Sequence, residues 1–159
     1  MKKLFIVRHG DYTDDGEYLN EPLSSLGKKQ ADSLADKLEG HVDKASVVIL
    51  SSTSLRATQF AEIISARLDL PFESSDLLWS GTGGKVFGIS DDFKKVLELL
   101  DKRPEDPDVV ILVTHYEYVG GFTRFFGRVK LDVRLLGEVI PKGTAWLIDC
   151  EKKELSYIS

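Results

Sequence analysis

The sequence predicts an α/β fold, a three-layer α/β/α sandwich around a mostly parallel sheet with an antiparallel strand at one edge. Three short runs of continuous apolar residues, 4–7, 47–50 and 109–113, are typical of strands buried on both faces. Segments with helical spacing of apolar residues separate these runs, as in βαβ units. Two final apolar segments, 145–148 and 155–158, are joined by a short charged stretch and predict a hairpin.

The first helix is expected between the first two strands. Its apolar residues recur at i, i+3, i+4 and i+7, and they are Ala31, Leu34, Ala35 and Leu38. Ser24 and Ser25 are the two candidates for its N-cap, and Gly40 is the expected stop.

Three further helices are predicted along the chain. The second follows the second strand over 57–68 and is closed by Pro71. The third covers 93–100 and ends in the proline-containing loop 104–107. The fourth is expected over 120–126, although two glycines at its start lower its helix propensity.

Length and composition narrow the class of protein. A chain of 159 residues with 42% hydrophobic and 30% charged residues is expected to form a single domain over 1–159. Its net charge of −5 argues against nucleic acid and anionic membranes as partners. One cysteine excludes an internal disulfide and a thiolate-rich metal site. The N-terminal apolar run stops at Arg8, too short for a signal peptide, so a cytoplasmic location is expected.

Polar residues follow the three apolar strands at the points where they end. Arg8 and His9 follow the first strand, Arg56 lies one turn into the helix after the second, and His115 follows the third. Ligands of open α/β sheets bind at the carboxyl ends of parallel strands, so these side chains are expected to meet. Any one of them alone would be interpreted as a loop histidine or a surface arginine.

Two histidines and two arginines at one sheet edge favour phosphoryl chemistry. Guanidinium groups bind phosphate oxygens in pairs, and the helix N-terminus near Arg56 adds backbone donors. A neutral imidazole can attack phosphorus and form a covalent phosphohistidine. Nearby arginines disfavour the imidazolium and stabilise charge on the transferred group.

The chain resembles the histidine phosphatase superfamily, the phosphoglycerate-mutase-like enzymes, and among them it is most similar to the SixA-type phosphohistidine phosphatases. The segments that carry the resemblance are 8–10 (Arg-His-Gly), 23–31, 51–59 and 113–115 (Val-Thr-His). Their order, spacing and position after strands all match. The chain is too short for the insertions that close over the substrate in mutases, which favours hydrolysis.

The resemblance implies a role for each residue at the strand ends. His9 would be the nucleophile, and Arg8, Arg56 and His115 would form the phosphate pocket. The sequence has no spaced set of His, Asp and Glu residues that indicates a metal site, and the arginines would supply the charge that Mg²⁺ gives elsewhere, so neither a metal nor a cofactor is expected.

One departure from the family pattern concerns the general acid. Many members carry a catalytic Glu after the second helix, and no matching Glu stands among the glycines of 73–84. Asp11, Asp76 and Glu117 are weak candidates for that role, each also explained as a solvated loop charge. Phosphohistidine has a nitrogen leaving group that protonates readily, so the gap favours a phosphohistidine substrate.

Alternative functions differ in their partner. The expected partner is a phosphorylated protein, for instance a phosphotransfer domain, and the alternative is a small phosphorylated metabolite. A phosphoryl-binding module without turnover is a further alternative, although binding alone does not need His9. A P-loop is excluded for 81–85, because Trp79 and Val86 stand where that motif requires Gly and Ser or Thr.

Overall fold

The computed structural model describes residues 1–18, 20–42, 45–79 and 89–159, and for residues 89 and 90 it describes the backbone alone. The glycine-containing stretch 81–85 that resembles part of a P-loop lies outside the described residues.

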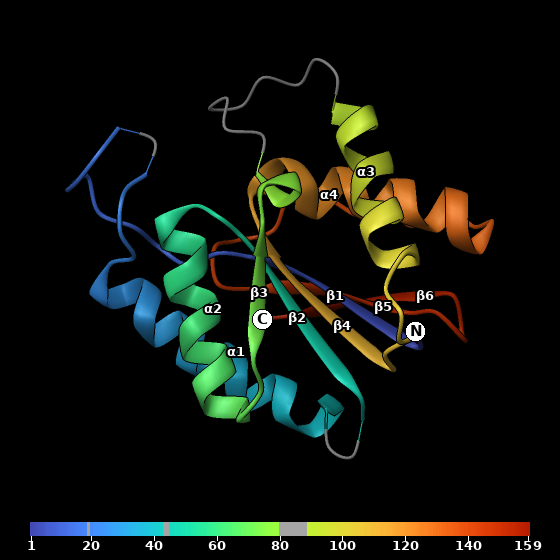
Figure 1. Cartoon of the computed structure of the whole chain (residues 1–159), viewed down its shortest axis with the longest axis horizontal. Coiled ribbons are helices and arrows are strands. Elements are labelled where there is room, and N and C mark those ends of the chain that lie inside the picture. Colours follow the sequence, from blue (N-terminus) through green and yellow to red (C-terminus); the bar gives the residue numbers. More distant parts are fainter. Residues whose placement is uncertain (19, 43–44, 80–88) are drawn as a thin grey trace.

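Six strands form one sheet in the order β3-β2-β4-β1-β5-β6 (Figure 1). They are β1 (Lys3–Arg8), β2 (Val47–Ser52), β3 (Phe72–Ser75), β4 (Val109–Thr114), β5 (Ala145–Asp149) and β6 (Glu154–Ile158). β1 pairs with β4 in parallel, and β2 pairs in parallel with both β4 and β3. β5 runs antiparallel to β1, and β6 completes the predicted hairpin with β5. The mostly parallel sheet with an antiparallel edge is confirmed.

Helices cover both faces of the sheet. They are α1 (Ser25–Val42), α2 (Leu55–Leu68), α3 (Ile89–Asp101) and α4 (Tyr116–Phe126), with a 3₁₀ turn η1 (Asp76–Leu78) and a π turn η2 (Gly127–Leu131). Figure 1 shows α1 and α2 together on one side and α3 and α4 together on the other. Alternate residues of β1 serve the two cores, because Phe5 and Val7 pack with α1 and α2 while Leu4 and Ile6 pack with α3 and α4.

Three features of the fold differ from the sequence predictions: one additional strand and the ends of two helices. The polar strand β3 was not predicted, because its residues Phe72-Glu73-Ser74-Ser75 lack apolar alternation and occupy a sheet edge. α1 continues past Gly40 to Val42. α4 begins at Tyr116 rather than at the glycines, so both glycines are inside the helix.

The loop after β1 is held against the start of α1 by close backbone contact. Ser24 is the N-cap, since its Oγ accepts the Gly27 N–H at 3.0 Å. A Cβ on Gly10 would lie 2.8 Å from the Gly27 carbonyl oxygen and 2.9 Å from the Phe60 ring. A Cβ on Gly27 would in turn collide with the carbonyl oxygen of Asp11. Because neither glycine has a Cβ, the segment that follows β1 can pack directly against the first turn of α1.

Gly27→Ala is expected to lower the free energy of unfolding by about 1–3 kcal/mol, because the added methyl meets backbone that cannot move aside. Gly40→Ala is the control in the same helix, since a Cβ there meets nothing within 4 Å. It should raise the free energy of unfolding by up to about 1 kcal/mol through helix propensity. Urea denaturation of both variants tests this, and equal stability of the two would contradict the close contact.

Candidate active site

The carboxyl end of β1 is fixed by backbone hydrogen bonds on both sides. The His9 N–H donates to the Thr114 carbonyl at 3.0 Å, which ties it to β4. The Gly143 N–H donates to the carbonyls of Arg8 and His9 at 3.0 and 3.1 Å. Gly143 has a φ of +74°, a conformation that favours glycine. The strand end is thus held rigidly between β4 and the turn before β5.

His9 is a buried histidine with a defined tautomer. Its side chain is 4% exposed, and Nδ1 lies 2.8 Å from the Gly10 carbonyl oxygen. Because a carbonyl oxygen only accepts, Nδ1 carries the proton and Nε2 keeps its lone pair. Arg56 Nε donates to this Nε2 at 3.2 Å. The nitrogen that faces Arg56 is therefore the unprotonated one.

The charge state of His9 follows from its surroundings. Burial is the largest cause that lowers the pKa of His9, the hydrogen bond to Gly10 opposes it, and the positive charges of Arg56, Arg8 and Lys142 add to the lowering, so that the pKa is about 3. The imidazole is consequently neutral at physiological pH.

The NMR titration of His9 should therefore show no midpoint between pH 5 and pH 8. The lowered pKa leaves the neutral form, protonated at Nδ1, as the only populated state in that window. Nitrogen-15 shifts of the imidazole measure both the tautomer and its titration. A midpoint near 6.5, the ordinary value for histidine, would contradict the buried neutral ring.

Arg56 reaches His9 from the first turn of α2. Its side chain is 11% exposed, and NH1 forms an ion pair with Glu21 Oε2 at 3.3 Å. The guanidinium carbon lies 4.8 Å from the centre of the Tyr12 ring, which stacks beneath it. Ion pair and ring together orient the guanidinium toward Nε2.

Arg8 is the last residue of β1 and directly precedes His9. Its NH1 donates to the Ile140 carbonyl at 2.8 Å, and its guanidinium lies 5.9 Å from the Tyr116 ring centre. Burial lowers the pKa of Arg8, against the raising effect of Tyr12 and Glu117. Its Nε is buried and has no hydrogen-bond acceptor among the described residues. A cation so placed has unused capacity to bind an anion.

His115 completes the set at the end of β4. It is 3% exposed, and its ring centre lies 4.9 Å from that of His9 in an edge-to-face arrangement. Its Nε2 lies 2.8 Å from Ser52 Oγ and 3.3 Å from Ser54 Oγ. Burial, followed by the charges of neighbouring groups, lowers the pKa of His115 well below the ordinary value. The structure thus brings Arg8, His9, Arg56 and His115 together at one sheet edge.

Sequence reasoning missed several residues around His9. Tyr12 lies edge-on to the His9 ring at 5.7 Å and also contacts Lys142, whose Nζ is 4.3 Å from the Tyr12 ring centre. Lys142 pairs with Asp11 Oδ1 at 3.1 Å. No motif marks Lys142, because it reaches the site through the turn whose Gly143 hydrogen-bonds the end of β1.

The three acid candidates have different surroundings. A hydrogen bond from Ser24, followed by the Lys142 contact, lowers the pKa of Asp11, which makes it a poor proton donor at neutral pH. Asp76 accepts a hydrogen bond from Thr53 Oγ1 at 2.6 Å. Glu117 lies in the first turn of α4, two residues beyond His115. None of these contacts assigns a general acid.

The part of the chain that the structure describes contains neither a metal-binding cluster nor a membrane-spanning helix. In the described part of the chain, no group of three or more His, Cys, Asp or Glu side chains is placed to hold a metal ion. None of the helices found there combines the length and the apolar character that a membrane span requires.

Fold and site together define a class: an α/β protein with a neutral histidine and two arginines at the carboxyl edge of its parallel strands. Residues 4–95 match the family model of the histidine phosphatase superfamily, branch 1. This match covers more than half of the chain, so the chain belongs to the histidine phosphatase superfamily. The resemblance noted in the sequence is confirmed.

Two curated proteins are similar in sequence to about half of this chain. Over 82 residues the chain is 37% identical to the mitochondrial serine/threonine-protein phosphatase PGAM5 of Xenopus tropicalis, and the match covers 50% of this chain and 29% of that protein. The matched part of the chain thus spans less than a third of the length of these curated relatives.

Solved structures share the fold over nearly the whole chain. The protein histidine phosphatase SixA complexed with tungstate matches with a TM-score of 0.66 and 20% identity, covering 99% of this chain and 94% of that one. A mycobacterial glucosyl-3-phosphoglycerate phosphatase matches with a TM-score of 0.65 and 20% identity, covering 99% and 97%.

Proposed function

We propose that this protein is a metal-independent phosphatase that acts through a covalent phosphohistidine at His9, with protein phosphohistidine as its substrate. The observation that carries the proposal is the tautomer of His9. Its protonated Nδ1 donates to the Gly10 carbonyl, and its unprotonated Nε2 accepts a hydrogen bond from Arg56 Nε. A buried neutral imidazole in this state is ready to act as a nucleophile.

The first chemical step forms one bond and breaks one. The Nε2 lone pair attacks phosphorus, the bond from phosphorus to the leaving group breaks, and its electron pair leaves with that group. The Gly10 carbonyl stabilises the positive charge that develops on the ring, because it accepts the Nδ1 proton. In the second step water attacks phosphorus, and Nε2 leaves as the neutral nitrogen with release of inorganic phosphate.

The phosphoryl oxygens would be held by cations of the protein. Arg56 lies within hydrogen-bond distance of Nε2, to which its Nε donates, and Arg8 has a buried Nε with no acceptor among the described residues. His115 lies against the His9 ring and can offer a ring nitrogen. These groups supply the charge stabilisation that Mg²⁺ supplies in many other phosphoryl transfers.

The chemistry of the leaving group favours phosphohistidine as the substrate. The pKa of Asp11 is lowered, so this carboxyl close to the site is ionised at neutral pH. An ester oxygen leaves poorly without an acid, whereas the nitrogen of a phosphoramidate protonates more readily. A site without an assigned acid therefore suits a phosphohistidine better than a phosphate ester.

A comparison of two substrates tests the proposal. We expect rapid release of phosphate from a phosphotransfer domain phosphorylated on histidine, and much slower release from p-nitrophenyl phosphate. Both assays are repeated after exhaustive chelation, with no loss of activity expected. Release from the ester alone would exclude the phosphohistidine substrate, and release from neither would leave a binding module. A loss restored by Mg²⁺ would exclude the metal-independent mechanism.

A small-molecule substrate is the second candidate. The fold that this chain shares with a mycobacterial glucosyl-3-phosphoglycerate phosphatase favours such a substrate. The same comparison distinguishes it, because a metabolite phosphatase is expected to prefer the ester.

A further inference from the structure

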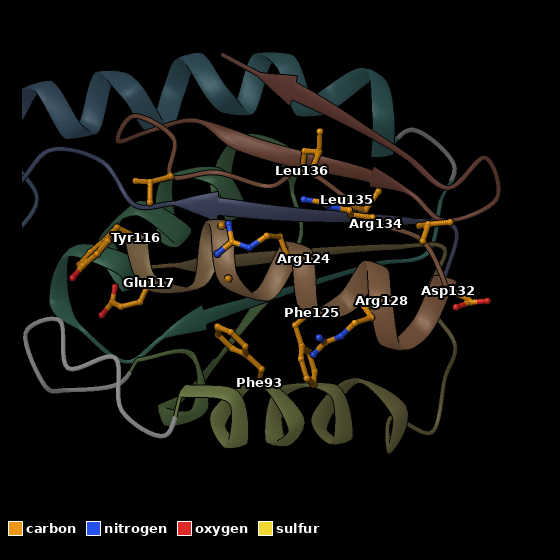
Figure 2. Close-up of a pocket in the computed structure, with 14 residues that line it drawn as sticks. Phe93, Tyr116, Glu117, Arg124, Phe125, Arg128, Asp132, Arg134, Leu135 and Leu136 are labelled. Atoms are coloured by element: carbon orange, nitrogen blue, oxygen red, sulfur yellow. The ribbon is translucent and has the colours of Figure 1, made fainter.

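A groove of about 930 Å³ runs along α4 (Figure 2). Its floor is α4, and its walls come from Phe93 of α3 and from the segment 132–139. Tyr116 and Glu117 lie at one end of the groove and Arg128 lies toward the other. Because the Arg8 guanidinium packs over the Tyr116 ring, the groove begins where the phosphoryl site ends.

Two glycines in α4 allow the walls to approach the floor. A Cβ on Gly121 would lie 2.7 Å from the Phe93 ring, and a Cβ on Gly120 would lie 3.0 Å from the backbone of Glu138. Glycine is costly inside a helix, so its presence at two successive positions has a packing reason here. The groove forms because its two walls pack closely against the middle of α4.

The groove is rich in arginine although the chain carries a net charge of −5. Arg124, Arg128 and Arg134 line it, and none of them forms an ion pair with a carboxylate among the described residues. Arg124 donates to the Gly137 carbonyl, which fastens the wall segment to α4. Arg128 and Arg134 are exposed and remain available to an anionic partner.

Large apolar side chains around the same groove are exposed to solvent. Leu136 is 67% exposed, Val139 is 59% exposed and Tyr116 is 42% exposed. Exposed apolar groups next to cations that have no ion-pair partner in the described part of the chain indicate an interaction surface for a partner with both apolar and acidic side chains.

We propose that this groove docks an acidic amphipathic helix of the phosphorylated substrate protein, an inference that rests on the proposed phosphatase function. The span from Tyr116 to Arg128 along a helix axis is about 18 Å, the length of a helix of about 12 residues. An apolar face would lie on Leu136, Val139 and Phe125, and acidic residues on its flanks would reach Arg128 and Arg134. The end nearest Tyr116 places the partner's phosphorylated side chain at Arg8 and His9.

A helix fits the observations better than a membrane surface does. Glu117 and Asp132 lie toward the two ends of the groove, so its arginines are confined to the stretch between them and are not spread over a broad flat face. Its arginines also lie along a recess, which suits a rod-shaped occupant rather than a flat one.

The test uses three fluorescein-labelled 18-residue peptides measured by anisotropy. One carries leucines at i, i+3, i+4 and i+7 with glutamates on its flanks, the second replaces the glutamates by lysines, and the third scrambles the leucines. Only the first is expected to bind. The double variant Arg128→Glu/Arg134→Glu should weaken its affinity by about tenfold or more through charge repulsion.

A matched charge reversal controls for net charge. Lys29→Glu/Lys37→Glu changes two exposed cations of α1 on the opposite face of the sheet, and should alter the affinity by less than about twofold. Equal binding of the lysine peptide, no binding of the acidic peptide, or full affinity in the Arg128/Arg134 variant would each overturn the proposal. Arginine-dependent binding to phosphatidylglycerol vesicles without peptide binding would also overturn it, in favour of a membrane.

Kinetics separate this proposal from the proposed function. The acidic peptide should compete with dephosphorylation of a phosphorylated phosphotransfer domain and leave hydrolysis of p-nitrophenyl phosphate unchanged. Turnover of the domain with no competition by the peptide removes the docking groove and leaves the phosphatase intact. Peptide binding without turnover of either substrate removes the phosphatase function instead.

Discussion

His9→Ala is expected to abolish turnover, with a loss of about 10⁴–10⁶-fold in kcat, as when the nucleophile of a covalent mechanism is removed. The structure gives the reason, because the Nε2 lone pair facing Arg56 has no substitute when the imidazole is gone. The fold should survive, since the strand end is held by backbone hydrogen bonds to Thr114 and Gly143 rather than by the ring.

The control is the third histidine of the chain. His41 lies in the last turn of α1, is partly exposed, and packs edge-on to the buried Phe5 with 5.3 Å between the ring centres. His41→Ala should keep full turnover, and circular dichroism should show that both variants are folded. Acid-labile phosphoryl label, trapped by rapid quenching, is expected on the wild type and not on His9→Ala. An active His9→Ala protein would exclude the covalent mechanism altogether.

The central part of the fold could be predicted because its strands are buried on both faces. All six residues of β4 are buried and the first five are apolar, so this continuous apolar run identifies the strand in the sequence. β3 has the opposite character. It lies at the sheet edge with polar residues exposed to water, and no apolar period distinguishes it from a loop.

The start of α4 shows a different limit. Helix propensity disfavours Gly120 and Gly121, yet both lie inside the helix because close packing against Glu138 and Phe93 requires the missing side chains. Tertiary packing here overrides local propensity, and a single sequence does not show which distant residue will pack against a glycine.

The four predicted site residues meet because each follows a parallel strand, and the carboxyl ends of parallel strands lie at one edge. Tyr12 and Lys142 could not be predicted by that rule. Lys142 precedes an antiparallel strand and reaches the site only because Gly143 hydrogen-bonds to the carbonyls of Arg8 and His9. Its contribution is long-range in sequence and depends on backbone geometry that no motif encodes.

Arg56→Lys is expected to lower turnover by about 10²–10³-fold, equivalent to about 2.7–4 kcal/mol of transition-state stabilisation. Lysine keeps the positive charge but lacks the planar fork, so it cannot bind two phosphoryl oxygens at once. In the structure the guanidinium contacts His9 through Nε and Glu21 through NH1 while it stacks on Tyr12. A point charge cannot make these three contacts together, so the orientation of the cation toward Nε2 is lost.

The melting temperature separates a catalytic from a structural role for Arg56. Packing of α2 rests on Ala57, Phe60 and Ala61, which are buried in the core, so Arg56→Lys should move the melting temperature little. Arg67→Lys is the matched control, since Arg67 lies in the same helix and pairs with Asp32 and Asp36 on the exposed surface. It should leave both turnover and melting temperature near the wild type, because exposed ion pairs contribute little. Wild-type turnover in Arg56→Lys would place Arg56 outside the phosphate pocket, whereas a loss of activity matched by a loss of stability would make it a structural residue.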